Sequence, residues 1–243
     1  MKILIVIPAR FKSSRFPGKP LKKILGKEMI LRVLDKCKKV KASNLKIIVA
    51  TDDERIKTIV EKNNFKCVIT SKNCLTGTDR VAEVADRYFA DIYINVQGDE
   101  PLISPNDIMR IIKAKKKYPN HIICGYKKIT NKENPHNVNI PKVIFNKKKE
   151  LIYISRGILP YSKEKKNLKK NNYFKQVCIY GFSKKDLKIF KSNTKSQIEL
   201  QEDIEIIRFL EINKKVLLVE TKSNSYAVDT KDDIARVEKY LKK

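Results

Sequence analysis

Hydrophobic residues in the first hundred positions form short β-branched runs that alternate with segments of helical spacing. The runs at 3–7, 46–50, 66–70 and 91–96 have the length and composition of buried strands. Between them, apolar side chains recur every three or four residues over 29–40, 56–60 and 78–88, which predicts amphipathic helices. Strands that alternate with helices are typical of a mostly parallel sheet flanked by helices. We therefore expect an α/β fold with a Rossmann-like sheet.

This alternation ends after a helix predicted over 108–117. From 122 to 154, short apolar runs recur without helical spacing and are separated by polar turns, which predicts hairpins. We expect a single domain over 1–243 with a hairpin-rich inserted lobe or dimer arm at roughly 122–175. The rest of the pattern predicts a mobile loop at 161–172, strands at 175–182 and 216–219, and helices from 198 to 212 and from 230 to 241.

The net charge of +27 favours anionic partners and raises the alternative of a nucleic-acid-binding protein. Of the 54 basic residues, however, only ten are arginines, and the lysines are dispersed over every segment. Dispersed lysine is typical of a solvated surface, whereas nucleic-acid binders concentrate arginine and aromatic residues in one patch. The positive electrostatic field of the whole chain still favours small anionic substrates.

The five cysteines, at positions 37, 67, 74, 124 and 178, are widely spaced and form no Cys-x-x-Cys pair. This spacing predicts neither a disulfide framework nor a zinc site, and it indicates buried thiols in a reducing compartment. No apolar run is long enough for a membrane span, and the short β-branched start lacks the pattern of a signal peptide. We expect a cytoplasmic protein.

A basic loop follows the first predicted strand and contains Arg10, Arg15 and Lys19 among Pro, Gly and Ser residues. Ligands of open α/β sheets bind at the carboxyl ends of the strands, where this loop begins. Arginine binds phosphate oxygens as a fork, and lysine supplies a compact point charge. The loop therefore predicts a polyphosphate site, with an ordinary basic surface loop as the alternative.

Carboxylates follow two other predicted strands. Asp99 lies in the turn Gln97-Gly98-Asp99-Glu100, and Asp229 ends a short strand predicted at 226–229. A carboxylate at a strand end can hold Mg²⁺ against phosphates. The alternatives are an ordinary turn at Asp99 and a helix cap at Asp229. Two such aspartates together with a cationic loop suit metal-assisted phosphoryl transfer.

A glycine-containing turn at 75–80 opens a predicted helix, whose free N–H groups could bind a base edge or an oxyanion. The alternative is a simple helix cap at Thr78. The chain has no Walker pattern, which argues against a P-loop NTPase. Its two histidines, His121 and His136, lack the neighbours of a catalytic triad or a zinc site.

Taken together and in their order along the chain, the polar segments resemble those of the 3-deoxy-manno-octulosonate cytidylyltransferase family, and the resemblance covers essentially the whole chain. The segments that carry the resemblance are Ile7-Pro8-Ala9-Arg10, Arg15-Phe16-Pro17-Gly18-Lys19-Pro20, Thr76-Gly77-Thr78-Asp79-Arg80, Val96-Gln97-Gly98-Asp99-Glu100-Pro101, Ser155-Arg156, Ile179-Tyr180-Gly181-Phe182 and Val228-Asp229-Thr230. The resemblance implies a fold like that of nucleotide-diphospho-sugar transferases and a homodimer. It also implies that CTP donates CMP to the anomeric hydroxyl of an eight-carbon sugar acid in lipopolysaccharide synthesis, with release of pyrophosphate and a requirement for Mg²⁺.

The resemblance also implies a role for individual residues. Arg10, Arg15 and Lys19 would hold the triphosphate as catalytic cations. The nucleotide site would comprise Ala9, Arg10, Lys19, Thr76, Gly77, Thr78, Arg80 and Gln97, and the metal ligands would be Asp99 and Asp229. The sugar acid would contact Arg156 through its carboxylate, and Gln176, Tyr180 and Glu205 would line its pocket. Glu199 lies on the same predicted helix face as Glu205, and we interpret it as part of a solvated acidic surface.

The chain departs from the family pattern near the sugar. Gln176 stands where the family usually has His, Ile206 stands where it usually has Gln, and Tyr226-Ala227 replaces small glycines. A buried hydroxyl that loses its partner costs about 1–3 kcal/mol, so these changes would weaken or redirect recognition of the sugar. The acceptor is therefore expected to be the octulosonate or a related acid, with an amino-substituted or nonulosonic acid as the alternative.

Overall fold

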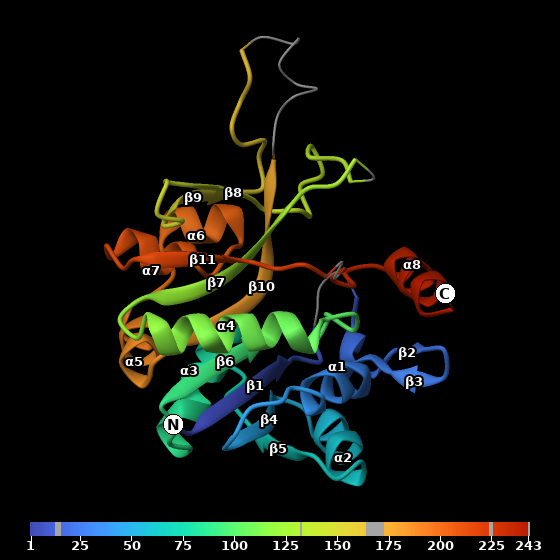
Figure 1. The fold of residues 1–243 in the computed structure, drawn as a ribbon. Coiled ribbons are helices and arrows are strands. Elements are labelled where there is room, and N and C mark those ends of the chain that lie inside the picture. Colours follow the sequence, from blue (N-terminus) through green and yellow to red (C-terminus); the bar gives the residue numbers. More distant parts are fainter. Residues whose placement is uncertain (13–15, 132, 164–172, 224–225, 243) are drawn as a thin grey trace.

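A computed structural model describes residues 1–12, 16–131, 133–163, 173–223 and 226–242 (Figure 1). Within these residues the chain forms one large mixed sheet with helices on both faces. The strand order is β11 (Val216–Glu220), β7 (Ile122–Lys128), β10 (Phe174–Phe182), β6 (Ile92–Val96), β1 (Ile3–Ala9), β4 (Leu45–Thr51) and β5 (Lys66–Ile69). The expected α/β class with a mostly parallel sheet is confirmed.

The parallel half of the sheet is built on β1, which pairs in parallel with β4 on one side and β6 on the other. Every residue of β1 is buried, as expected for a strand covered on both faces. Because these strands run the same way, their carboxyl ends meet at one edge of the sheet. Ala9 and Gln97 lie at or just after these ends.

Strand β10 is antiparallel to both of its main neighbours, β6 and β7, and connects the two parts of the sheet. Its side chains at 176, 178 and 180 point towards the same face of the sheet, because successive side chains of a strand alternate between the two faces. Residues 122–175, predicted as an inserted lobe or dimer arm, contribute β7 to the sheet and a hairpin of β8 (Lys142–Phe145) and β9 (Leu151–Ser155). The hairpin joins the sheet through a pairing of β8 with β10.

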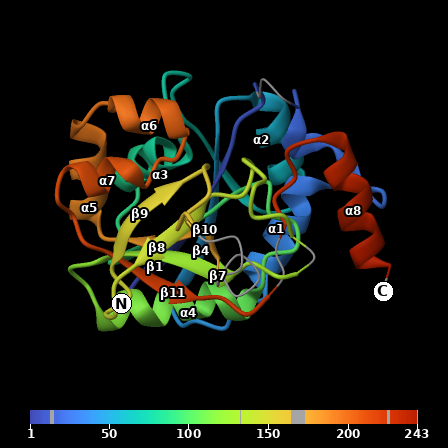
Figure 2. The same ribbon diagram turned by 90° about the horizontal axis from the view of Figure 1, so that it is seen from above.

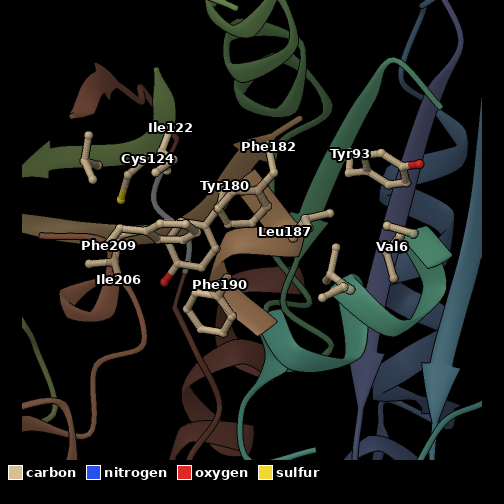
Figure 3. Close-up of a cluster of buried hydrophobic side chains, with 14 of the residues drawn as sticks. Val6, Tyr93, Ile122, Cys124, Tyr180, Phe182, Leu187, Phe190, Ile206 and Phe209 are labelled. Carbon is tan, nitrogen blue, oxygen red and sulfur yellow. The ribbon is translucent and has the colours of Figure 1, made fainter. Parts of the chain in front are cut away.

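Two layers of helices cover the sheet. Helices α1 (Met29–Lys38), α2 (Glu54–Lys62) and α4 (Pro105–Lys117) bury their apolar faces against one side, with Ile5 and Ile7 of β1. Helices α3 (Gly77–Arg87), α5 (Lys184–Ser192) and α7 (Ile207–Glu211) pack on the other side (Figure 2). Figure 3 shows the aromatic part of this second core, where the Phe182 and Phe209 rings stack with centroids 5.6 Å apart.

The carboxy-terminal helix α8 (Lys231–Leu241) lies away from both layers and packs near the small hairpin of β2 (Lys23–Ile24) and β3 (Lys27–Glu28) (Figure 1). A separate apolar cluster, which includes Phe16, Ile24 and Val237, joins these elements. The helix therefore fixes the segment that precedes it beside the basic loop, and that segment carries Asp229.

Two expectations about elements fail. The helix predicted over 198–212 is two short helices, α6 (Gln197–Glu202) and α7, because Asp203 adopts the left-handed conformation at φ 49° and ends α6. Residues 226–229 form no strand. Helix α5 and the β2–β3 hairpin were not predicted from the sequence, and most of the predicted mobile loop, 164–172, lies outside the described residues.

Candidate active site

A cavity of about 300 Å³ lies at the edge of the sheet where the strands β1 and β6 end. Most residues predicted for the site line it. They are Ala9, Arg10, Lys19, Thr76, Gly77, Arg80, Gln97, Asp99, Arg156, Gln176, Tyr180, Glu205 and Asp229. Thr78 is buried behind the lining, and Arg15 lies outside the described residues. One cavity thus brings together segments from both ends of the chain.

Lys19 lies between the two predicted metal ligands. Its Nζ is 2.6 Å from Oδ2 of Asp99 and 3.3 Å from Oδ1 of Asp229. Burial alone lowers the pKa of Lys19, but the charges and hydrogen bonds of Asp99 and Asp229 outweigh it, so the pKa lies above its ordinary value. The ammonium is therefore a fixed positive charge in this wall of the cavity.

Backbone contacts hold the two aspartates in place. The N–H of Val228 donates to the carbonyl oxygen of Asp99 over 2.9 Å, which ties the Asp229 segment to the turn after β6. Gly98 in that turn lies so near the carbonyl oxygen of Pro8 that a Cβ would be 2.8 Å from it. Only glycine permits this approach, and the approach places Asp99 beside the basic loop.

The donor set fits a magnesium ion. Mg²⁺ is usually held in proteins by one or two carboxylates together with waters and substrate phosphates. Asp99 and Asp229 supply two carboxylates that approach one cationic group, Lys19. No cluster of three or more His, Cys, Asp or Glu side chains suited to a metal is found in the described part of the chain. A metal here would therefore depend on oxygen atoms of the substrate.

Arg10 is an exposed cation of the cavity wall at the end of β1. No hydrogen bond or ion pair links its guanidinium to another of the described side chains. The five N–H donors of the group are thus available to an anion in the cavity.

The first turn of α3 forms a second wall. Thr76 is its N-cap, and it exchanges hydrogen bonds with Asp79 in a capping box. The alternative of a cap at Thr78 is therefore wrong. Instead, the N–H of Thr78 donates to Oε2 of Glu205 over 2.8 Å. Thr76 and Gly77 face the cavity at a helix N-terminus, which favours a negatively charged or carbonyl-bearing ligand.

Glu205 joins this turn to the strand β6. Its Oε1 accepts a hydrogen bond from Nε2 of Gln97 over 3.1 Å. Burial raises the pKa of Glu205, while hydrogen bonds from Thr78 act in the opposite direction. With both carboxylate oxygens bonded inside the wall, Glu205 fixes the orientation of the Gln97 amide.

Arg80 borders the cavity but points its donors into the protein. Its Nη1 donates to Oγ1 of Thr70 and its Nη2 to Oδ2 of Asp52, each over 2.7 Å. The side chain is only 3% exposed, so it has little surface to offer a nucleotide. Its contacts instead hold the loops after β4 and β5 against α3.

Arg156 follows β9 and lies at the other end of the cavity, beside Glu202 and Asp203. Its Nε donates to the carbonyl oxygen of Glu202 over 2.5 Å, and its Nη2 to that of Asp203 over 3.0 Å. These bonds fix the plane of the guanidinium. Nη2 also forms a long ion pair of 3.8 Å with Oδ2 of Asp203, a largely exposed carboxylate, so the charge is only partly compensated and a carboxylate of the acceptor could still bind it.

Gln176, Cys178 and Tyr180 form the wall supplied by β10. Nε2 of Gln176 donates to the hydroxyl of Tyr180 over 3.1 Å, and the thiol of Cys178 lies 3.8 Å from Oε1 of Gln176. Burial raises the pKa of both Cys178 and Tyr180 well above ordinary values, so both are neutral donors.

Sequence reasoning missed several polar residues around the site. Cys178 lines the cavity, and alternation along β10 with Gln176 and Tyr180 was the signal that could have found it. Glu199 was interpreted as solvated, but it is fully buried against Arg208, so that interpretation is wrong. Lys142, also buried, donates to the carbonyl oxygen of Arg156 over 2.5 Å.

Fold and site together define a nucleotidyltransferase, because a parallel sheet presents cations and paired carboxylates in one cavity at its strand ends. The profile of the cytidylyltransferase family matches residues 4–216.

Individual relatives narrow this class. The chain is 39% identical to a 3-deoxy-manno-octulosonate cytidylyltransferase of Fusobacterium nucleatum, over 100% of this chain and 98% of the relative. It is 36% identical to an 8-amino-3,8-dideoxy-manno-octulosonate cytidylyltransferase of Shewanella putrefaciens, over 99% of each. A solved structure of CMP:2-keto-3-deoxy-manno-octonic acid synthetase complexed with CTP aligns with a TM-score of 0.90 and 33% identity, covering 100% of this chain and 99% of that one. The chain therefore belongs to the family of 3-deoxy-manno-octulosonate cytidylyltransferases.

Two further findings concern the chain as a whole. All five cysteines are free thiols, and three of them, Cys37, Cys67 and Cys124, are buried. None of the helices in the described ranges is long and apolar enough to span a membrane.

Proposed function

We propose that this protein transfers CMP from CTP to the anomeric hydroxyl of 3-deoxy-manno-octulosonate, or of a closely related 2-keto-3-deoxy sugar acid, and releases pyrophosphate. The observation that carries the proposal is the convergence of Lys19, Asp99 and Asp229 in one cavity. Asp99 lies 80 residues and Asp229 210 residues from Lys19 along the chain. A fold that brings these charges together provides both the cations and the carboxylates that a nucleoside triphosphate requires.

In the proposed reaction the hydroxyl oxygen of the sugar acid bonds to the α-phosphorus of CTP. The bond from this phosphorus to the oxygen that bridges to the β-phosphate breaks, the hydroxyl proton passes to water, and pyrophosphate leaves with the electron pair of the broken bond. Arg10 and Lys19, together with Arg15, would bind the triphosphate and stabilise the charge that develops on it. Positioning of the two substrates supplies the rest of the rate enhancement.

Asp99 and Asp229 would hold Mg²⁺. When bound, the ion would neutralise phosphate charge and polarise the phosphorus–oxygen bonds. The partial exposure of both carboxylates, 27% for Asp99 and 22% for Asp229, supports this role, because a ligand in the cavity can reach them.

The nucleotide would lie against Ala9, Thr76, Gly77 and Gln97. The N–H groups of Thr76 and Thr78 already bond to Asp79 and Glu205, so the N–H of Gly77 is the donor at the start of α3 that is suited to a carbonyl or phosphate oxygen. The oriented Gln97 amide is suited to a base edge. Thr78 and Arg80 would contribute as supports of this wall, since their polar groups bond within the protein.

The acceptor would lie between Arg156 and the β10 wall. The Arg156 guanidinium would bind the sugar carboxylate, and Gln176 and Tyr180 would surround the hydroxyls. Glu205, whose carboxylate bonds to Thr78 and Gln97, would lie where the acceptor meets the nucleotide wall. An amino-substituted octulosonate is the second candidate acceptor. It is favoured by the relative that carries 8-amino-3,8-dideoxy-manno-octulosonate in its name and by the neutral Gln176 in place of the usual His.

We further propose a cytoplasmic homodimer. The five free thiols support a reducing compartment. Exposed apolar residues in the 122–175 region, such as Val138 and Ile152, support an interface with a second copy.

The test measures pyrophosphate release by purified protein with CTP, Mg²⁺ and 3-deoxy-manno-octulosonate. The expected result is release that requires the sugar acid and Mg²⁺ and that is lost when GTP replaces CTP. A parallel reaction contains the 8-amino acid. Faster release with that acid would assign the second acceptor, and release with neither acid would refute the proposal.

A further inference from the structure

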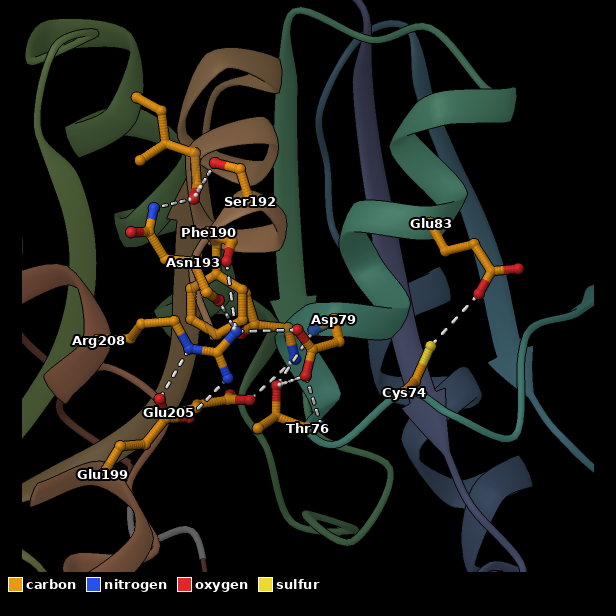
Figure 4. Close-up of polar contacts among 12 residues, drawn as sticks. Cys74, Thr76, Asp79, Glu83, Phe190, Ser192, Asn193, Glu199, Glu205 and Arg208 are labelled. Carbon is orange, nitrogen blue, oxygen red and sulfur yellow. Dashed lines mark hydrogen bonds and ion pairs between the residues drawn. The ribbon is translucent and has the colours of Figure 1, made fainter. Parts of the chain in front are cut away.

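A buried cluster of charged side chains lies behind the first turn of α3 (Figure 4). At its centre is Arg208 of α7, whose side chain is 4% exposed. Its Nε donates to Oε2 of Glu199 over 2.7 Å, and its Nη2 donates to Oε1 of the same carboxylate over 2.8 Å. The guanidinium also stacks on the ring of Phe190, 3.8 Å from its centroid. Neither Arg208 nor Glu199 belongs to the lining of the active-site cavity.

The Nη1 group of the guanidinium contacts the turn that lines the cavity. Nη1 of Arg208 donates to Oδ1 of Asp79 over 3.1 Å. The other oxygen of Asp79 accepts hydrogen bonds from the N–H and the hydroxyl of Thr76, each over 2.8 Å. Arg208 thus holds the acidic member of the capping box, and the capping box holds Thr76 against the cavity.

The segment between Glu199 and Arg208 contacts the cavity wall at two further points. Glu205 binds the N–H of Thr78 and the amide of Gln97, on the nucleotide side. Glu202 accepts the N–H of Arg156 over 2.8 Å, on the acceptor side. The pair that fixes the two ends of this segment therefore fixes contacts to both sides of the cavity.

A buried ion pair is weak evidence for stability, because removing two charges from water offsets much of their attraction. What the fork of Arg208 does supply is geometry, since its donors are directed at Glu199, Asp79 and backbone carbonyl oxygens in one plane. A turn that must bind a ligand needs such support from behind.

We propose that Arg208 and Glu199 form a positioning pair that sets the Thr76–Thr78 turn for nucleotide binding. This inference rests on the proposed function, in which that turn contacts CTP. Neither residue touches the substrate, so the pair acts through Asp79 and Glu205 on the affinity for CTP.

The test uses a double variant, Arg208→Met with Glu199→Leu, which removes both charges and leaves neither one buried alone. The affinity for CTP is measured by calorimetry with Mg²⁺ and without acceptor. We expect a Kd for CTP about tenfold higher than that of the natural protein, since small misplacements of a binding group are costly. We also expect kcat at saturating CTP to change less than about threefold, because no group that faces the reacting atoms is altered.

A matched control is the double variant Lys115→Met with Asp186→Asn. This pair is also buried, with Nζ 2.8 Å from Oδ2, and its acidic member also belongs to a capping box, that of α5. Neither residue lines the cavity. We expect a comparable loss of thermal stability and an unchanged Kd for CTP.

An unchanged Kd in the Arg208→Met, Glu199→Leu variant would overturn the inference, and so would an equal increase in the control. If that variant does not fold, the single variant Arg208→Lys keeps the charge and loses the fork. It is expected to raise the KM for CTP and leave kcat unchanged, and a normal KM would again overturn the inference. Failure of the natural protein to bind CTP would instead refute the proposed function itself.

Discussion

Lys19 is held between two carboxylates that reach it from distant parts of the chain. Asp99 contacts it more closely than Asp229 does, with distances to Nζ of 2.6 and 3.3 Å. Without a cation, two carboxylates this close would repel each other. The ammonium thus stabilises the arrangement that the proposed metal would need, and these two side chains are the most direct targets for mutation.

Replacement of either aspartate by asparagine should lower turnover at least about 100-fold, because a proposed metal ligand and a partner of Lys19 are lost together. The side chain keeps its size, so the fold should persist with a loss of about 1–3 kcal/mol in the free energy of unfolding. Steady-state pyrophosphate release at several Mg²⁺ concentrations measures the effect.

Asp232→Asn is the matched control, since Asp232 is exposed in the first turn of α8, close to Asp229 in sequence. It should leave turnover and its Mg²⁺ dependence unchanged. Near-normal turnover in Asp99→Asn or Asp229→Asn would mean that the assigned carboxylate is not a metal ligand.

Residues of the cavity could be predicted where a strand end identified them. Lys19, Gln97 and Asp99 follow apolar runs, and a parallel sheet gathers such positions at one edge. The burial of Glu199 against Arg208 could not be predicted, because Glu199, Glu202 and Glu205 recur every three residues, and on an uninterrupted helix this spacing indicates a solvated acidic face. The left-handed residue Asp203 turns the chain between Glu199 and Arg208, and both side chains then face inward.

At the scale of elements, capping boxes recur where helices meet the core. The box of α5 joins Ser183 and Asp186, and Asp186 also accepts a hydrogen bond from the buried Nζ of Lys115 on α4. This single cap therefore links helices on opposite faces of the sheet. Loss of the Ser183 hydroxyl and loss of the Asp186 carboxylate should therefore lower the free energy of unfolding by different amounts.

Ser183→Ala should lower the free energy of unfolding by about 1 kcal/mol, the usual cost of a lost N-cap. Asp186→Ala should cost about 3–5 kcal/mol, because it leaves the charge of Lys115 buried without its partner. Urea denaturation measures both values, and the Kd for CTP is expected to be unchanged in each. Equal costs for the two variants would contradict the role assigned to Lys115.

Long periodic elements and buried strands were predictable, whereas breaks and irregular segments were not. Strand β1 is apolar at every position from Ile3 to Ile7, so its sequence permits one interpretation. The helical pattern across 198–212 continues through Asp203, and the sequence alone gives no sign that tertiary contacts of Glu202 and Glu205 favour a turn there. Residues 226–228 have strand-like composition but bond to the turn at Asp99 and not to a strand.

At the scale of the whole molecule, the hairpin of β8 and β9 extends the sheet beyond its seven-stranded path. In the part of the chain that the structure describes, β9 pairs with β8, and only Glu150 just before it bridges to Leu217 of β11, so the other edge of β9 is otherwise unpaired. Ile152 on β9 is 57% exposed, and Val138, which precedes β8, is 60% exposed. Exposed apolar residues and an edge strand in one region are typical of a surface that another chain covers.

If this region is the proposed homodimer interface, Ile152→Asp should dissociate the dimer, because a carboxylate would be buried there without a partner. Sedimentation velocity at micromolar concentration is expected to give the mass of two chains for the natural protein and of one chain for the variant.

Phe89→Asp is the matched control, since Phe89 is also exposed, at 64%, but follows α3, outside the 122–175 region. A dimer that survives Ile152→Asp and dissociates with Phe89→Asp would place the interface near α3, and a natural protein that sediments as one chain would refute the dimer. Because Arg156 follows β9 directly, a dimer through this hairpin would also stabilise the acceptor side of the cavity, and Ile152→Asp should then raise the KM for the sugar acid more than that for CTP.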